Sequence, residues 1–409
     1  MLLHEQRSRV RAVGIAIVAG AAIAVTGCGS DDGGGASGGG STDGEIVIGA
    51  TGPLTGPASS LAILYDAMRA KIAEVNAQGG IEGHKVRLAV QDDQLNPANT
   101  PGVVRKLVEG EKVSLLCGSA GSPTNVAVLP YLGARKVALV PGAGGSDLAA
   151  ENSYIPLPTY EPLAASLVDY GLGDGKAERI AIAYSEDAVG KPTRAGANWA
   201  LQQKNEKAVA EVKYNPTAAD QSAAAAKLKA SGADFVVVNN TAPVLAPLIK
   251  AAAKIGYRPT WGIMWPALTD TLVELVGEDA AERIVFASPF LLGSDPKAAG
   301  FREALTKQKP GADTNDTIAM LGWVAATTCT ELVKKAVQAN GGKTPSTEQV
   351  IQAMPGFSYG DDYVPDIKWT EEDHSTKGNG AIIGVRDGKF TPLTESAPLP
   401  DAPIAEPGN

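Results

Sequence analysis

Short β-branched runs alternate with amphipathic helical patterns along most of this chain, and this alternation constrains the fold more than any other feature. The first run is 45–50, and apolar residues then recur at helical spacing from Leu61 to Val75. Further strands are predicted at 86–90, 113–117, 137–140, 179–184, 234–239, 260–263 and 284–287, with helical patterns such as 244–255 between them. Strands separated by helices form right-handed βαβ units, so the pattern predicts an α/β fold with parallel sheets.

The strand cores are uninterrupted apolar runs, as in Phe235-Val-Val-Val238. Such runs are typical of parallel strands whose two faces are both covered by helices. A chain of 409 residues is too long for one ordinary hydrophobic core and long enough for two. We therefore expect two doubly wound parallel-sheet lobes.

Charge and composition exclude several classes of function. There are 36 Lys and Arg against 45 Asp and Glu, with no dense basic run, so a nucleic-acid partner is not expected. Three His and three Cys argue against zinc clusters, disulfide scaffolds and most His-dependent catalysis. The acidic clusters at 92–93, 361–362 and 371–373 lack EF-hand spacing, and we interpret them as solvated loops rather than calcium sites. No metal or cofactor is predicted.

Residues 1–27 have the pattern of a secretory signal peptide. Three Arg precede a mostly apolar run at 12–26, and the run ends in Val25-Thr26-Gly27-Cys28, which resembles a bacterial lipobox. A short membrane helix is the alternative, but spanning needs about 20 apolar residues. We expect Cys28 to carry a lipid on the extracytoplasmic face of a bacterial membrane, with the Gly-rich residues 28–44 as a flexible linker. Residues 393–409 form a Pro-rich C-terminal tail without an assignable role.

Several Gly- and Ser-containing loops follow the predicted strands at their carboxyl ends. They are 118–125, 141–147, 239–241 and the segment ending at Trp265. Ser122 is a natural N-cap, with Pro123 as first helical residue, and the unpaired N–H groups there would hold an anionic oxygen. A single loop of this kind can merely build a turn. Because ligands of open α/β sheets lie outside the carboxyl ends of strands, several such loops predict a shared cleft.

Three segments resemble the opening of branched-chain amino acid binding proteins. They read Ile46-Val-Ile-Gly-Ala-Thr-Gly-Pro-Leu-Thr-Gly-Pro57, then Val75-Asn-Ala-Gln-Gly-Gly-Ile-Glu-Gly-His-Lys-Val-Arg-Leu88, then Asp92-Asp93 with Asn96-Pro97. The resemblance extends over about 45–390. It implies the type I periplasmic binding protein fold, the solute receptor of an ABC importer, and a binding protein rather than an enzyme.

The resemblance also implies lobes, partners and mechanics. One lobe would comprise 45–157 plus 291–357, and the other 158–290 plus 358–392, joined by three crossovers. A small-molecule ligand would lie in the cleft, and hinge closure would signal to the permease and ATPase subunits of the importer. We expect a lipid-anchored monomer. A sensor for a membrane signalling protein would use the same cleft, and the sequence leaves that alternative open.

The resemblance assigns ligand contacts in the first lobe to Leu61, to Ser122 and to the backbone of Ala143, Gly144 and Gly145. Gly144 stands where the family has a Thr.

In the second lobe the family uses two Tyr and one Glu, and the matching positions here are Val189, Thr241 and Trp265. The family's Glu grips the ligand ammonium, and no acid lies within 262–268. A buried ammonium without a carboxylate costs several kcal/mol. We therefore expect a small carboxylate with an apolar or aromatic body, held at Ser122, without an essential α-ammonium.

Two catalytic interpretations compete with binding. Cys117-Gly-Ser-Ala-Gly121 is close to a nucleophile elbow around Ser119, but His374 is the sole candidate base that follows it. The loop 142–147 begins like a dinucleotide-binding loop, yet Asp147 occupies its third Gly position.

Cys117 and Cys329 both fall in the first lobe. In an oxidising compartment a disulfide between them is allowed, and two buried thiols are the alternative.

Overall fold

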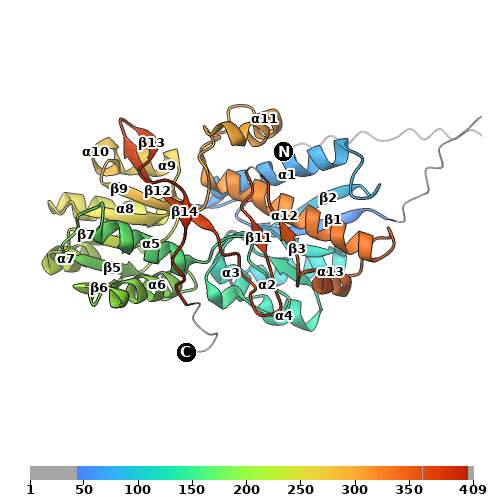
Figure 1. The fold of residues 1–409 in the computed structure, drawn as a ribbon, viewed down its shortest axis with the longest axis horizontal. Coiled ribbons are helices and arrows are strands. Elements are labelled where there is room, and N and C mark those ends of the chain that lie inside the picture. Colours follow the sequence, from blue (N-terminus) through green and yellow to red (C-terminus); the bar gives the residue numbers. More distant parts are fainter. Residues whose placement is uncertain (1–43, 362, 404–409) are drawn as a thin grey trace, which may run out of the picture. The chain divides into compact units, whose positions relative to one another are not determined.

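The computed structural model describes residues 44–361 and 363–403. The predicted signal peptide, the lipidation site at Cys28 and almost all of the linker lie outside these residues. Within them, no helix has both the length and the apolar character needed to cross a membrane. The described chain contains two large sheets, one parallel and one mostly parallel, each covered by helices on both faces, and it passes between them three times (Figure 1).

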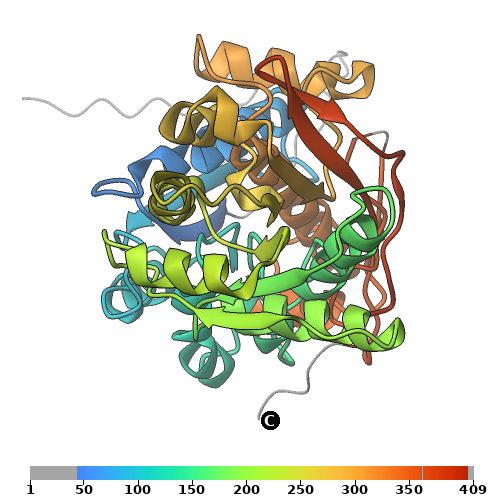
Figure 2. The same cartoon turned by 90° about the vertical axis from the view of Figure 1, so that its left-hand side faces the viewer.

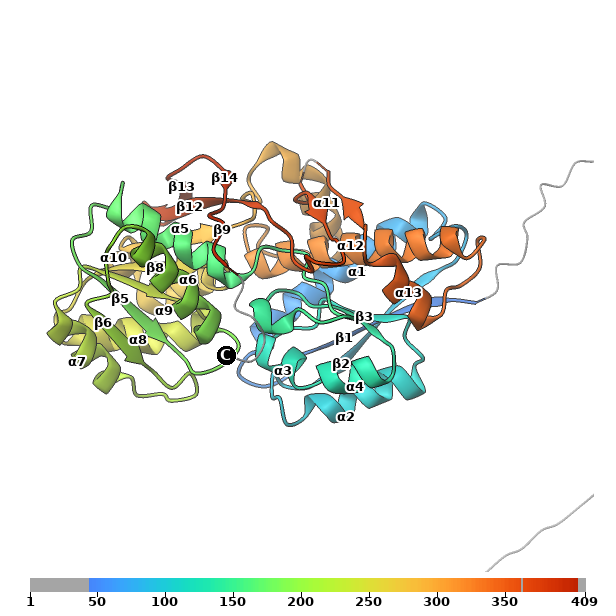
Figure 3. The same cartoon turned by 60° about the horizontal axis from the view of Figure 1, so that its bottom comes forward.

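The first sheet has four parallel strands in the order β2-β1-β3-β4. All seven residues of β1 are buried, as expected for the central strand of a covered parallel sheet. Alternate β1 side chains face opposite helix layers: Ile46 and Ile48 pack toward α1 and α12, and Val47 packs toward α2 and α4. Figure 3 shows these helices on the two sides of the sheet. The elements of this lobe are β1 Ile46–Gly52, α1 Ile63–Ala77, β2 Val86–Asp92, α2 Thr100–Arg105, β3 Leu115–Cys117, α3 Ser122–Val126, α4 Leu129–Ala134, β4 Ala138–Val140, α11 Ala299–Gln308, α12 Thr317–Ala339 and α13 Thr347–Ala353.

The second sheet runs in the order β13-β12-β9-β8-β7-β5-β6, and five of its strands are parallel. Its last two strands are antiparallel and form the red hairpin at one edge (Figure 2). Helices α5 and α6 cover one face, and α7, α8 and α9 cover the other. The elements are α5 Tyr160–Leu172, β5 Ile180–Tyr184, α6 Gly190–Gln203, β6 Ala210–Lys213, α7 Ser222–Ser231, β7 Phe235–Val238, α8 Ala242–Lys254, β8 Thr260–Met264, α9 Asp270–Val276, α10 Glu278–Ala281, β9 Ile284–Ser288, β12 Asn379–Arg386 and β13 Lys389–Pro392.

The fold prediction is confirmed in its main features. Every strand predicted from an apolar run is present within one or two residues of its predicted bounds. The three crossovers follow β4, β9 and α13, where the chain leaves one lobe for the other. Strands β6, β12 and β13 had no counterpart in the sequence prediction.

A short hairpin lies between the last helix of the first lobe and β12. It comprises β10 Ser358–Tyr359 and β11 Ile367–Lys368, which pair only with each other. The indole N–H of Trp369 donates to the carbonyl of Ile155 at 3.1 Å, and Tyr363 stacks on Phe301 of α11 at 5.4 Å between ring centroids. These contacts are with the first lobe and the first crossover, whereas the second lobe was predicted to resume at residue 358. That lobe boundary therefore stays a proposal.

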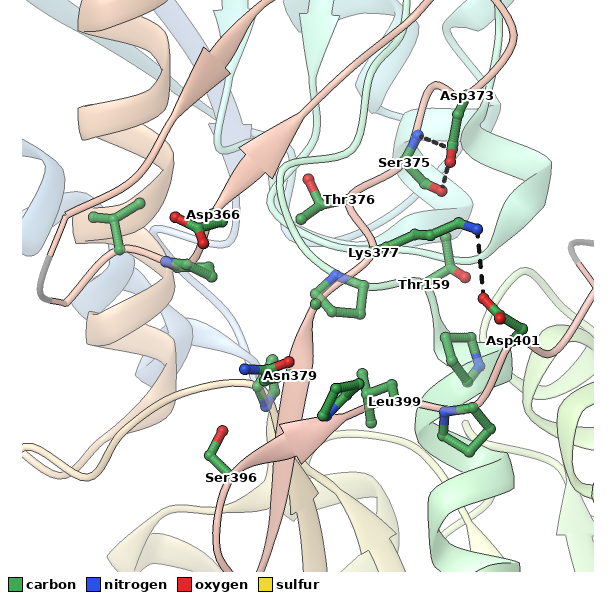
Figure 4. A pocket seen from close by; sticks show the side chains of 18 of the residues that line it. Thr159, Asp366, Asp373, Ser375, Thr376, Lys377, Asn379, Ser396, Leu399 and Asp401 are labelled. Carbon is green, nitrogen blue, oxygen red and sulfur yellow. Dashed lines mark hydrogen bonds and ion pairs between the residues drawn. The ribbon is translucent and has the colours of Figure 1, made fainter.

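The end of the described chain lies along the third crossover. β14 Ala397–Pro398 pairs with the start of β12, the N–H of Leu399 donates to the carbonyl of Gly378 at 3.0 Å, and Lys377 forms an ion pair with Asp401 (Figure 4). We call residues 396–403 the C-terminal strap. The tail, to which the sequence analysis assigned no role, therefore makes specific contacts at one of the segments that join the lobes.

Cys117 and Cys329 are joined by a disulfide, with their Cα atoms 6.4 Å apart. Cys117 ends β3 and Cys329 lies within α12, and both side chains are fully buried. The bond therefore links the sheet of the first lobe to the helix that covers it.

Candidate functional site

A cavity of about 360 Å³ lies where the loops after the strands of both sheets meet. Apolar side chains make up much of its wall, among them Leu61, Leu95 and Leu321 from the first lobe and Val244 from the second. The polar side chains in the wall are Ser119, Ser122, Thr124, Tyr160, Asp187, Thr217, Asn239, Asn240 and Thr241. Among the described residues, no Lys or Arg lines this cavity. Such a site suits a small and largely apolar solute with a few fixed polar groups.

Six of the eight predicted contact residues line this one cavity. They are Leu61, Ser122, Ala143, Val189, Thr241 and Trp265. They come from both lobes, so the structure brings together residues as distant in the sequence as Leu61 and Trp265.

Gly144 and Gly145 are not among the lining residues. A Cβ on Gly145 would lie 2.2 Å from Cγ of Pro192 in α6, and a Cβ on Gly144 would lie 2.1 Å from Cδ1 of Leu148. The absent side chain at Gly145 therefore allows the first-lobe loop to approach the second lobe. The backbone contact with a ligand that the resemblance implies for Gly144 and Gly145 stays a prediction.

The N-cap prediction for Ser122 is wrong. The helix α3 begins at Ser122, and Gly121, with φ of +85°, occupies the preceding position that allows the sharp entry into the helix. The Ser122 hydroxyl makes no capping bond and lies 3.5 Å from the hydroxyl of Tyr160. Burial raises the pKa of Tyr160 to about 12, so that hydroxyl keeps its proton. The two hydroxyls, one from each lobe, thus meet in the cavity wall.

The loop that carries Ser122 is held by its own hydrogen bonds. The amide of Asn125 donates to the carbonyl of Ser119 at 2.9 Å, and the Ser119 hydroxyl accepts from the N–H of Thr51 at 3.1 Å. These bonds tie the loop to the carboxyl end of β1. The Ser122 hydroxyl is therefore presented from a fixed backbone.

Trp265 directly follows β8 and is 1% exposed. Its ring packs edge-on against Phe290 at 5.1 Å between centroids, and its carbonyl accepts from the hydroxyl of Thr317 at 2.7 Å. The indole N–H has no hydrogen-bond partner in the described chain. Trp265 therefore lines the cavity and carries a buried indole N–H that is unpaired in the described chain.

Asp187 is a cavity residue that the sequence analysis missed. Its Oδ1 accepts from the hydroxyl of Ser185 at 2.7 Å and from the N–H groups of Val189 and Gly190 at 3.0 Å, at the start of α6. The signal for this position was an Asp in the short loop between a strand and a helix, three residues before the Gly190 that begins α6. The absence of an acid from 262–268 therefore does not leave the second lobe without one.

The lobes also touch beside the cavity. Glu161, fully buried at the start of α5, accepts from the N–H and the hydroxyl of Ser146 at 3.2 and 2.7 Å. Asp147 follows, and burial together with the nearby Glu161 raises its pKa to about 6. Two carboxyl groups are thus held close to each other where the first-lobe loop meets α5.

Among the described residues, the hydrolase interpretation finds no histidine base for Ser119. His374 bonds to the carbonyls of Ala150 and Glu371 at 2.8 and 3.0 Å, and His84 bonds to those of Gly44 and Gly342. Neither imidazole contacts Ser119. Within the described ranges no group of His, Cys, Asp and Glu could hold a metal ion.

A larger cavity, of about 920 Å³, lies among the crossovers and the C-terminal strap (Figure 4). Its wall includes Pro158, Lys377 and Leu399 and none of the predicted contact residues. It is lined by the crossovers and the C-terminal strap rather than by strand-end loops of both sheets, so the smaller cavity is the candidate site.

Two α/β lobes with one cavity at their facing strand ends define a solute-binding protein of the two-lobed type. The sequence profile of the Periplasmic binding protein family matches residues 45–389, and the chain belongs to this family. The resemblance noted from the opening motifs is thereby confirmed, and the protein is a solute binder rather than an enzyme.

Individual relatives agree with this family. An amino acid binding protein of Pseudomonas aeruginosa is 26% identical over 261 residues, which cover 62% of this chain and 68% of that protein. The chain spans between about half and two thirds of the length of the curated relatives that it matches.

Two solved structures have the same fold. A branched-chain amino acid ABC transporter protein from Thermus thermophilus, with bound valine, matches with a TM-score of 0.76 and 20% identity over 87% of this chain and 97% of its own. A solute-binding protein from R. palustris in complex with 4-hydroxybenzoate matches with a TM-score of 0.77 and 22% identity, over 88% and 99% of the two chains.

Proposed function

We propose that the protein is the solute-binding component of an ABC importer and takes up a small carboxylate with an apolar or aromatic body. The observation that carries this proposal is the cavity between the lobes, to which both sheets contribute residues at their carboxyl edges. The relatives bind amino acids and a hydroxybenzoate, as their names state, and both classes are small carboxylates.

The carboxylate would lie against the first lobe. The Ser122 hydroxyl of the first lobe and the Tyr160 hydroxyl of the second, 3.5 Å apart, offer neutral donors at that point, which suits a singly charged group in a cavity that no described Lys or Arg lines. Hydrogen bonds to a charged group are stronger than neutral ones, each stabilising by about 1.5–3 kcal/mol. The apolar body would then pack on Leu61, Val189 and Trp265.

We further propose that Cys28 anchors the protein at the extracytoplasmic face of the membrane, with the Gly-rich linker holding the lobes near the importer. The mature protein would act as a monomer that closes around its solute. The lipobox-like sequence supports the anchor. Mass spectrometry of protein purified from bacterial membranes would show a diacylglycerol on Cys28 if the anchor is right.

Calorimetry with leucine, valine, phenylacetate and benzoate tests the solute class. Ser122→Ala should weaken a bound carboxylate about 10- to 100-fold, the loss of one bond to a charged group. Ser358→Ala, at an exposed serine outside the cavity, is the matched control and should bind as the parent does. The proposal is wrong if none of the four acids binds and no small carboxylate is found in the purified protein by mass spectrometry.

A further inference from the structure

Asn239 is the most unusual polar residue in the cavity wall. It directly follows β7, its side chain is 1% exposed, and it lines the cavity. Neither its Oδ1 nor its Nδ2 has a hydrogen-bond partner in the described chain. A buried polar group without a partner costs about 1–3 kcal/mol, and here both ends of one carboxamide are unpaired.

The neighbouring polar groups do not share this property. The Tyr214 hydroxyl donates to the backbone carbonyl of Asn239 at 3.1 Å and accepts from the amide of Asn240 at 3.3 Å. The fold therefore satisfies the groups around Asn239 while leaving the Asn239 side chain for another partner.

A second unpaired donor comes from the adjacent strand. β7 and β8 are parallel neighbours, with Val238 opposite Ile263, and Trp265 follows the end of β8 as Asn239 follows the end of β7. The indole N–H of Trp265 is likewise buried and unpaired, and Trp265 lines the same cavity. Two residues with unpaired polar groups thus directly follow neighbouring strands and line the same wall of the cavity.

The negative charge of the second-lobe wall limits which ligand groups can pair with Asn239 and Trp265. Asp187 stands in the same second-lobe wall, and no Lys or Arg among the described residues balances it there. A second carboxylate would be repelled and would lose its hydration without compensation. A neutral hydroxyl or amide group can accept from the indole N–H and exchange hydrogen bonds with the carboxamide.

We propose that the solute carries, besides its carboxylate, an uncharged hydroxyl or amide group that pairs with Asn239 and the Trp265 indole N–H. This inference rests on the proposed function, since it takes the carboxylate to lie against the first lobe. Asn239 and Trp265 are then the residues that distinguish such a solute from a purely apolar acid of the same size.

Calorimetry with matched pairs of acids tests the inference on the full-length protein. The pairs are 4-hydroxyphenylacetate with phenylacetate, and leucine with 4-methylpentanoate, each pair differing in one polar group. We expect the parent protein to prefer 4-hydroxyphenylacetate to phenylacetate by about 10-fold or more, which corresponds to one hydrogen bond in a buried site. Asn239→Leu and Trp265→Phe should each reduce that preference to about 3-fold or less.

Asn198→Leu is the matched control, because Asn198 lies on α6 outside the cavity and bonds to Glu211. It should keep the preference. Thermal melting without solute provides a second measurement: Asn239→Leu removes two unpaired buried atoms, so its melting temperature should not fall below that of the parent. A fall would show that Asn239 has a structural role and would overturn its assignment as a specificity residue.

The outcomes separate the inference from the proposed function. Equal binding of both phenyl acids by parent and variants would refute the inference and leave a carboxylate-binding protein. Preference for leucine over 4-methylpentanoate that survives Asn239→Leu would also refute it, because Asp187 would then be holding an ammonium. If none of the four acids binds and mass spectrometry finds no carboxylate in the purified protein, the proposed function fails, and the inference with it.

Discussion

Removing the disulfide between Cys117 and Cys329 should lower the free energy of unfolding substantially. The two residues are 212 positions apart, so the bond closes a very long loop in the unfolded chain. The chain-entropy description then gives a stabilisation of about 5 kcal/mol at 25 °C, which is an upper value because unfolded chains retain some structure. Both sulfur atoms lie in the buried core between β3 and α12, so the native lobe can accept the bond without exposing either residue.

Guanidinium denaturation followed by circular dichroism measures the effect. The parent should carry Cys28→Ser, since the chain has three Cys and the remaining two are then the pair of interest. The double variant Cys117→Ala/Cys329→Ala should unfold at a clearly lower denaturant concentration. Its transition should also be steeper, because its unfolded state exposes more surface without the cross-link.

Thiol titration in concentrated guanidinium without reductant provides the independent check. The Cys28→Ser parent should show no free thiol before reduction and two after it. Two thiols before reduction would refute the bond. An unchanged denaturation midpoint in the double variant would instead refute the energetic argument, even with the bond present.

Four other changes test separate parts of the structure. The pKa of Asp147 is raised to about 6, so the folded protein binds this proton more tightly than the unfolded chain does. The free energy of unfolding should therefore fall as the pH rises from about 4 through 6. Asp147→Asn should remove that fall, and in urea denaturation at pH 8 it should be more stable than the parent by about 1–2 kcal/mol. Removing residues 396–409 deletes the pairing of β14 with β12 and the hydrogen bond of Leu399. It should lower the free energy of unfolding by about 1–2 kcal/mol and speed amide hydrogen exchange in β12. Unchanged exchange would show that the C-terminal strap is dispensable. Saturation with a tightly bound solute should reduce the radius of gyration in small-angle scattering, and an unchanged radius would contradict hinge closure. Trp265→Ala should weaken an aromatic solute by about 1–3 kcal/mol in calorimetry, and unchanged affinity would place the ring outside the contact.

The parallel core of the fold could be predicted from the sequence, because buried parallel strands are continuous apolar runs. Phe235–Val238 is such a run, and all four side chains are buried. β6 was missed because it is an edge strand with the sequence Ala-Glu-Val-Lys, in which only the Val is buried. The β12–β13 hairpin did carry a signal, since Asp387-Gly388 is a type I′ turn pair and both residues have positive φ.

The residues of the cavity wall could be predicted from the sequence only in part. Ser122, Thr241 and Trp265 were found because each follows a predictable strand, and such positions share one edge of a sheet. Asp187 was missed because an acid was expected only within 262–268, around the position that matches the family's Glu. A side chain can reach the cavity from another strand end, and which one does so depends on how the two lobes pack. That the Asn239 side chain is left without a partner likewise depends on how distant segments pack around it.

The division of polar groups between the lobes has a consequence for selectivity. The neutral hydroxyl of Ser122 lies in the first lobe, and the unpaired groups of Asn239 and Trp265 lie in the second with Asp187. A solute with both polar groups can satisfy the two walls only when the lobes are together, so its binding energy favours the closed arrangement. An apolar acid with the carboxylate alone leaves Asn239 unpaired on closure and gains correspondingly less from it. We therefore expect phenylacetate to reduce the radius of gyration less than 4-hydroxyphenylacetate at equal saturation, and equal compaction by both acids would show that closure does not depend on the second polar group.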